Sequence, residues 1–502
     1  MNHNKRDMKQ FLFTPVLIIV TGLLSCRSVA QVAGKNTGVP VHKTIQLNAG
    51  NRFQTIDGFG VNITPAQWRG GNLKTALDSL TDNLGTTLIR FDCFGRANWL
   101  DPSKQNAEGS FPADYLKQVY TSPVFKDAWA AFRYLNSKGI EPVFNISGAV
   151  PAAWTVANNI KTNRLKNFDA YASMAASLLV WAREKEGLKF SLFMPFNETD
   201  LGYPEGPRLL DEDCMPAINA ILKKLKENNL GDIQCIIMDD ANCNPQRIKN
   251  IVTNLTDADK IKGIGVHTYG NGAEEDNRNF WYNLESQYAK ANTIIQQSPL
   301  KNKSFLLTEY GDLDQSGEIE FEFAWRSTRR LLKCLNDGVT GAIAWDAFDN
   351  FHEHDTVWAL YGLLKTDTTN WTYTAKQRFY AAKQVYKYVR PGFQRIAIEA
   401  TENTPAYVYT EWKNTLRNML LSAYTSPDGK DFTLVGMSNV EADVELEINL
   451  TGFAKNITGK PVYYYRTSRN ENCVQLQQAG IKDGSVKIII PEKSIFTITT
   501  VQ

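Results

Sequence analysis

The stretch Phe190–Asp200, which reads FSLFMPFNETD, decides how the rest of the chain is interpreted. Its residues up to Phe196 are almost all apolar, which is typical of a strand that is buried on both faces. The run then ends abruptly at the polar pair Asn197-Glu198. A carboxylate that directly follows a buried strand is a candidate catalytic acid, and a partner for Glu198 must then come from another strand of the same sheet.

Similar apolar runs recur along the chain and alternate with stretches of helical spacing. Together with Phe190–Phe196, the predicted strands are Gly58–Ile63, Thr86–Phe91, Ile140–Ile146, Ile233–Met238, Ile264–His267, Phe305–Thr308 and Ala342–Trp345. The predicted helices are Leu73–Asn83, Val124–Ser137, Phe168–Glu186, Met215–Asn228, Gln246–Leu255, Glu274–Gln297, Glu318–Asn336 and Ala375–Val389. Eight strand-then-helix units over residues 57–390 predict a parallel (β/α)8 TIM barrel, an α/β fold. A doubly wound open sheet is the alternative.

The pattern changes after residue 390. Short alternating runs follow, separated by turn residues such as Pro427-Asp428-Gly429. Period-two alternation with this punctuation is typical of an antiparallel sandwich. Residues 391–502 are therefore predicted to form a C-terminal β-sandwich, and residues 44–56 to supply a further strand ahead of the barrel.

The N-terminus is predicted to be a targeting segment. Basic residues precede the apolar run Phe11–Leu24, which is short for a membrane span and has the layout of a secretory signal. The run ends in Leu23-Leu24-Ser25-Cys26, which resembles the lipobox of bacterial lipoproteins. We expect a signal peptide over residues 1–26, lipidation of Cys26, a linker over residues 27–43, and export to the outer membrane or cell surface, or otherwise to the periplasm or medium.

The composition excludes several classes of partner. The 55 Lys and Arg residues nearly balance the 53 Asp and Glu residues, so no net field favours nucleic acid. The remaining cysteines are sparse and form no CxxC pair, which argues against a zinc site or a disulfide framework. The spacing in His352-Glu353-His354-Asp355 fits no helical metal motif. We expect no metal, no cofactor, no membrane contact apart from the lipid anchor, and a monomer.

Polar side chains follow the predicted barrel strands from the second to the eighth. They are Arg90, Asp92, Asn145, Ser147, Asn197, Glu198, Asp239, Asp240, His267, Tyr269, Glu309, Tyr310, Trp345 and Asp346. Active sites of such barrels gather at the C-terminal ends of the strands. Glu198 and Glu309 follow the fourth and seventh strands, which lie across the barrel mouth from one another. Asp239 and Asp240 are adjacent, so at most one of them faces the cleft.

Paired carboxylates across a cleft are what glycoside hydrolysis requires. One, kept protonated, gives its proton to the departing oxygen, and the other attacks the anomeric carbon. Beside the acid, Asn197 offers an amide for a sugar hydroxyl, and Glu205 follows closely enough to contact one. Asn145 is interpreted as another substrate-binding residue, and Trp154 as a sugar-stacking ring.

The same residues carry a resemblance. Asn197-Glu198 with Thr308-Glu309-Tyr310 resembles the clan A glycoside hydrolases, which are retaining enzymes on a (β/α)8 barrel. A narrower likeness, to glycoside hydrolase family 30, comes from residues 54–60 (QTIDGFG), 147–154 (SGAVPAAW) and 388–393 (YVRPGF). The family's barrel carries a side β-sandwich built from an early strand and the C-terminal strands, which implies that residues 44–56 join the sandwich.

The resemblance also implies residue roles. Glu198 would be the acid/base and Glu309 the nucleophile, with Asn197 as the partner amide. His267 and Tyr269 would line the subsite around them. By the same likeness, Trp345 would be a sugar platform and Arg90 would tether the nucleophile. The chain departs from the family pattern at Thr199, where a proline is common.

The sequence thus predicts an exported retaining glycosidase that acts on β-linked oligo- or polysaccharides. A catalytically inactive surface glycan-binding protein on the same scaffold is one alternative. A clan A glycanase of another family, of mannanase or cellulase type, is the other.

Overall fold

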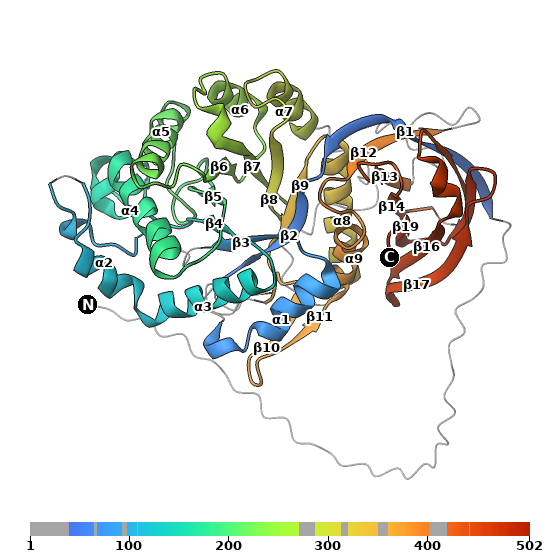
Figure 1. The fold of residues 1–502 in the computed structure, drawn as a ribbon, viewed down its shortest axis with the longest axis horizontal. Helices are drawn as coiled ribbons and strands as arrows, with labels where there is room; N and C mark the ends of the chain where they lie inside the picture. The colour runs from blue at the N-terminus through green and yellow to red at the C-terminus, as the bar shows by residue number, and fades with distance from the viewer. Residues whose placement is uncertain are drawn as a thin grey trace, which may run out of the picture. The chain divides into compact units, whose positions relative to one another are not determined.

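The computed structural model describes residues 40–64, 68–92, 98–107, 109–270, 287–312, 320–349, 360–400, 419–440 and 442–502 (Figure 1). Eight parallel strands close into a barrel in chain order. They are β2 (Gly58–Ile63), β3 (Leu88–Asp92), β4 (Val143–Asn145), β5 (Leu192–Met194), β6 (Gln234–Asp240), β7 (Ile261–Gly270), β8 (Ser304–Asp312) and β9 (Gly341–Ala344). Each overlaps a predicted strand. The closed barrel confirms the predicted fold class and excludes the open doubly wound sheet.

Helices connect the barrel strands and surround them (Figure 1). They are α1 (Lys74–Asp78), α2 (Ala113–Tyr120), α3 (Pro123–Ser137), α4 (Phe168–Val180), α5 (Asp211–Glu227), α6 (Pro245–Val252), α7 (Gln287–Gln296), α8 (Glu320–Asn336) and α9 (Gln377–Tyr386). Wider helical turns extend α1 to Leu84 and α4 to Lys185. The predicted start of the seventh helix, at Glu274, lies outside the described residues. In the described part of the chain, no helix has the length and hydropathy that crossing a membrane requires.

Glycine allows the closest approach between barrel strands. A Cβ on Gly60 would lie 1.6 Å from the carbonyl oxygen of Leu88, and a Cβ on Gly263 would lie 2.0 Å from that of Ser304. No side chain fits at such distances, so the neighbouring backbones can pack only against glycine. These two residues therefore help to set the geometry of the barrel.

The remaining strands form a second, nine-stranded sheet, whose order is β17-β16-β19-β14-β13-β12-β1-β15-β18. Its members are β1 (Val41–Thr55), β12 (Gln394–Ala400), β13 (Met419–Thr425), β14 (Phe432–Ser438), β15 (Val444–Thr451), β16 (Pro461–Ser468), β17 (Glu471–Gly480), β18 (Ser485–Ile490) and β19 (Ser494–Thr499). Strand β1 pairs with β12 and β15. The sheet curls around its own hydrophobic core, which includes Leu47, Leu434 and Phe496. The N-terminal strand therefore completes the C-terminal sandwich, as expected.

Three strands and one α-helix of the described residues were not predicted from the sequence. Strand β17 is a polar edge strand, and its side chains lack the apolar alternation that marks a buried face. The hairpin of β10 (Leu364–Asp367) and β11 (Thr372–Ala375) consists of four-residue strands, too short for a periodic signal. Helix α2 has only eight residues and buries Tyr120 alone.

The sheet is attached to the barrel through α8 and α9. The amide of Gln384 on α9 donates a hydrogen bond to Thr467 at 2.9 Å, and that of Asn336 on α8 donates one to the carbonyl of Leu421 at 2.9 Å.

Candidate active site

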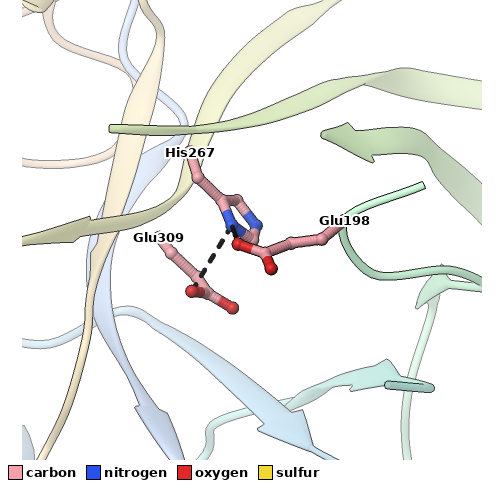
Figure 2. Close-up of side chains that lie close together, drawn as sticks. All are labelled: Glu198, His267 and Glu309. Carbon is pink, nitrogen blue, oxygen red and sulfur yellow. Dashed lines mark hydrogen bonds and ion pairs between the residues drawn. The ribbon is translucent and has the colours of Figure 1, made fainter. Parts of the chain in front are cut away.

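Glu198, His267 and Glu309 converge at the carboxyl ends of the barrel strands (Figure 2). Nδ1 of His267 lies 3.0 Å from Oε1 of Glu198 and 3.4 Å from Oε2 of Glu309. One carboxylate oxygen of each glutamate and a ring nitrogen all lie within 4.8 Å of one another. The two carboxylates that the sequence placed on the fourth and seventh strands are therefore neighbours.

Irregularities of the backbone determine the directions in which these side chains point. The pairing of β7 with β8 shifts register between Val266 and His267, and beyond the shift His267 lies opposite Glu309. Such a bulge re-aims a side chain and is common beside active sites. Beyond the end of β5, Glu198 has a φ of 44°, which is in the left-handed region, and its N–H donates to the carbonyl of Asp239 at 2.6 Å.

Arg90 is the central cation of the site and is 0% exposed. Its guanidinium donates four hydrogen bonds: to Asn62 and Glu309, both at 2.6 Å, to Asn197 at 2.5 Å and to Asp239 at 2.8 Å. The planar fork of arginine suits such a fixed arrangement of acceptors. Arg90 therefore holds Glu309 in one orientation, as the resemblance implied, and also orients the amide of Asn197.

The electrostatics of the site follow from this dense packing of charges. Burial opposes protonation of His267, but the nearby charges of Glu309 and Asp239 raise its pKa well above 6.5. Burial disfavours the charged form of Glu309 as well and raises the pKa of that carboxyl group, while the cations His267 and Arg90 act against the rise. Burial and the charge of Glu309 raise the pKa of Tyr269. His267 is thus held as a cation.

Tyr269 remains a neutral phenol, and its hydroxyl donates a hydrogen bond to Oε2 of Glu309. Together with the Arg90 bond to Oε1, this leaves both oxygens of Glu309 with a donor. Hydrogen bonds of this kind stabilise the ionised form of a carboxylate. These two donors therefore favour the ionised form of Glu309 against the burial that raises its pKa.

Sequence reasoning undervalued two residues of the site. Asp239 is 1% exposed, accepts hydrogen bonds from Arg90 and His267, and was noted only as one of an acidic pair. Burial opposes its ionisation, yet the charges of Arg90 and His267 lower its pKa. Asn62 accepts from Arg90 and follows the glycines of β2, but it gave no signal beyond its place near the end of a strand.

The loop after Glu198 brings Glu205 to the site. The side chain of Glu205 is exposed, but its backbone carbonyl accepts from Asn197 and from the N–H of Gly148. The protein that surrounds its carboxyl group, then the charges of Glu198 and Glu309, raise the pKa of Glu205 to about 7. The amide nitrogen of Asn197 has two N–H groups, and one remains after the bond to Glu205.

Two predicted substrate-binding residues are buried instead. Trp154 is 2% exposed and belongs to the hydrophobic core, so neither face of its ring is open to a sugar. Asn145 is 0% exposed, and its amide donates to the carbonyl of Phe196 at 2.9 Å, which supports the segment that leads to Glu198. Burial argues against direct contact of either side chain with a sugar, and the two substrate-binding roles stay predictions. Trp345 remains partly exposed just after β9, as a platform requires.

The trio of Glu198, His267 and Glu309 has the residue types of a metal site. However, the positive charge of Arg90 lies 2.6 Å from Glu309, so a metal ion there would meet a like charge. The arrangement suits proton transfer better than metal binding. The His352–Asp355 segment lies outside the described residues.

Comparisons with known proteins were informative at the level of structure. No protein-family model matches the sequence, and no curated protein matches it. A GH30 endoxylanase from Clostridium papyrosolvens aligns with a TM-score of 0.64 at 18% identity, over 91% of this chain and 99% of that chain. An endo-β1,6-glucanase aligns with a TM-score of 0.63 at 17% identity, over 91% of this chain and 94% of that chain. A conserved exported protein from Bacteroides fragilis aligns with a TM-score of 0.66 at 14% identity, over 91% of this chain and 100% of that chain.

At these identities the likeness shows the fold. The chain has the architecture of glycoside hydrolase family 30 within clan A, a (β/α)8 barrel with a side β-sandwich.

Proposed function

We propose that the chain is a retaining glycoside hydrolase that cleaves β-linked glycans by double displacement. The observation that carries the proposal is the pair Glu198 and Glu309, which have carboxylate oxygens within 4.8 Å of one another at the barrel mouth. Carboxyl groups about 5–5.5 Å apart are typical of retention, whereas about 6.5–9.5 Å leaves room for the water of an inverting enzyme. The glycanase fold of the structural neighbours supports the same assignment.

In the first step, an ionised oxygen of Glu309 attacks the anomeric carbon, and the bond from that carbon to the glycosidic oxygen breaks. Glu198 gives its proton to the departing oxygen, and a covalent glycosyl-enzyme forms. Arg90 and Tyr269 each donate a hydrogen bond to one oxygen of Glu309 and so hold the orientation of its carboxylate for the attack.

In the second step, water attacks the same carbon and Glu198, now ionised, takes its proton. The bond to Glu309 breaks, and Glu309 returns to its ionised form with its donors in place. The imidazolium of His267 lies 3.0 Å from Glu198 and stabilises its carboxylate between the two steps. The remaining N–H of Asn197 is available for the sugar hydroxyl beside the reacting carbon, and Trp345 for the face of a sugar ring.

Mutation of the two carboxylates tests the proposal. For Glu198→Gln we expect kcat/KM on substrates with poor leaving groups to fall by about 10²–10⁴-fold, with partial survival on activated aryl glycosides. For Glu309→Ala we expect near-complete loss on both kinds of substrate. An unimpaired Glu309→Ala enzyme would exclude the mechanism.

An inactive glycan-binding protein is the second candidate, since the same cleft could hold a sugar without cleaving it. Mass spectrometry after exposure to a fluorinated activated sugar separates the two. A covalent adduct on Glu309 supports the hydrolase, because a binding protein needs no nucleophile. Absence of an adduct across a panel of gluco-, xylo- and galacto-configured reagents favours the binder, and release of sugars from a polysaccharide panel would identify the substrate.

We also propose that the chain is exported, is lipidated on Cys26, and acts as a monomer. The support is the lipobox-like Leu23–Cys26 segment, which lies outside the described residues. Mass spectrometry of the mature protein is expected to find an acylated N-terminal Cys26, and Cys26→Ala is expected to release the protein from membranes.

A further inference from the structure

The turn after β5 is attached residue by residue to the end of β6. Glu198, Thr199 and Asp200 bond to three successive positions there, the last two residues of β6 and the residue that follows them. The bonds run from Glu198 N–H to the carbonyl of Asp239, from the Thr199 hydroxyl to the carboxylate of Asp240, and from the N–H of Ala241 to the carboxylate of Asp200. The position of Glu198 is therefore set in part by contacts between its turn and the end of β6.

Thr199 is at the centre of this attachment. Its hydroxyl donates to Oδ1 of Asp240 and accepts from Nη2 of Arg247 at 2.9 Å, so both of its hydrogen-bonding roles are used. Arg247 also donates from Nε to Oδ2 of Asp240 at 2.8 Å, which closes a triangle of three groups. All three residues are buried. A buried ion pair needs its remaining hydrogen bonds satisfied, and the Thr199 hydroxyl supplies one such bond to each ion, while Arg247 also bonds to Asp211 and to the carbonyl of Leu209.

The backbone at Glu198 needs such support. A non-glycine residue with a φ of 44° is in an unfavourable conformation, which persists only when the surrounding structure imposes it. Proline at position 199, which the resembling enzymes commonly have, would bring no hydroxyl and would restrict the residue before it to extended conformations. Threonine allows the left-handed turn and bonds it to Asp240 and Arg247.

We propose that Thr199 is a positioning residue for Glu198: its hydroxyl, locked between Asp240 and Arg247, holds the turn that directs the Glu198 carboxyl toward His267 and Glu309. This inference rests on the proposed function, because positioning matters only if Glu198 transfers a proton. Thr199 itself does not contact the reacting atoms.

The test is the dependence of rate on the leaving group. Thr199→Val keeps the shape of the side chain and removes the hydroxyl. We expect kcat/KM to fall by about 10–10²-fold on aryl β-glycosides with poor leaving groups, and by less than about 3-fold on dinitrophenyl glycosides, which need no acid. The plot of log kcat/KM against leaving-group pKa therefore steepens. Thr199→Ser, which keeps the hydroxyl, is expected to restore the wild-type slope.

A matched control is Thr433→Val in the C-terminal sheet. The Thr433 hydroxyl is also fully buried and also makes two hydrogen bonds, to Thr499 and to the carbonyl of Tyr388. Its loss is expected to lower stability without changing the slope. If Thr199→Val does not fold, Arg247→Lys is measured in its place, because lysine keeps the charge opposite Asp240 but cannot span both partners. A wild-type slope in Thr199→Val, or in Arg247→Lys where that variant takes its place, overturns the inference.

The two proposals fail in different ways. If Glu198→Gln steepens the slope and Thr199→Val does not, positioning by Thr199 is wrong and the hydrolase assignment stands. If the wild-type protein cleaves no aryl β-glycoside and Glu309 takes no adduct, the proposed function itself is wrong, and the inference falls with it.

Discussion

Replacement of Arg90 is the most informative perturbation of the site. Arg90→Met keeps a long side chain in a fully buried place but removes four hydrogen bonds and the charge that faces Glu309 and Asp239. Breaking a buried ion pair by removing one partner costs about 3–5 kcal/mol of stability, because the other charge stays buried without compensation. We expect the free energy of unfolding in urea to fall by about that amount.

The same change alters the ionisation of the nucleophile. An opposite charge at hydrogen-bond distance lowers the pKa of a carboxyl group by about 1–3 units. Arg90 lies 2.6 Å from Glu309, whose pKa is already raised by burial, so removal of the cation raises it further. Glu309 must be ionised to attack. The acid limb of the kcat/KM profile is therefore expected to move to higher pH by about one unit or more.

The assay is the pH dependence of kcat/KM on an activated aryl glycoside, for which acid catalysis matters least. Arg90→Lys is the control, since it keeps the charge and loses the planar fork, and its acid limb is expected to stay close to that of the wild type. An acid limb at the wild-type pH in Arg90→Met would refute the idea that Arg90 sets the ionisation of Glu309.

Three further predictions concern the rim, the trio and the barrel. The pKa of Glu205 is raised to about 7, so its carboxyl group changes charge near that pH. KM for a neutral glycan is therefore expected to change near pH 7 in the wild type. In Glu205→Gln this pH dependence is expected to be absent from the KM values obtained from initial rates. The pKa of His267 is raised in the folded state. Its contribution to stability is therefore complete below about pH 6.5 and is lost as the pH rises through the folded-state pKa. The free energy of unfolding in urea is expected to fall at alkaline pH in the wild type, and this fall is expected to be absent in His267→Asn. Gly60→Ala is expected to destabilise the fold by more than about 3 kcal/mol, since its Cβ would lie 1.6 Å from the carbonyl of Leu88, whereas Gly139→Ala, which meets only open space, should cost about 1 kcal/mol in thermal or urea unfolding.

Much of the fold was predictable because its signal is local. A barrel strand buried on both faces reads as a short apolar run, and all eight runs of that kind became strands of the closed barrel. Elements without a buried face escaped prediction. Strand β17 lies at the edge of its sheet and exposes Val474 and Leu476, so its sequence has the composition of a loop.

The candidate site was predictable in part for the same reason. Glu198 and Glu309 directly follow or end apolar runs, and the rule that barrel sites gather at strand ends brought them together before any distance was known. Trp154 and Asn145 also lie at or beyond a strand end, but Trp154 packs in the hydrophobic core and the amide of Asn145 bonds to the carbonyl of Phe196. Residue type and position along the chain do not distinguish a side chain that faces the barrel mouth from one that packs beneath it.

The sequence by itself determined the barrel, the side sandwich and the two carboxylates, because periodicity and strand order are properties of the chain. Only the tertiary structure decided what surrounds those carboxylates. Arg90 reaches four acceptors from four different strands or strand ends, and Thr199 meets Arg247 from 48 positions away. Contacts of this kind depend on how the strands are placed in space, and no local pattern of residues encodes them.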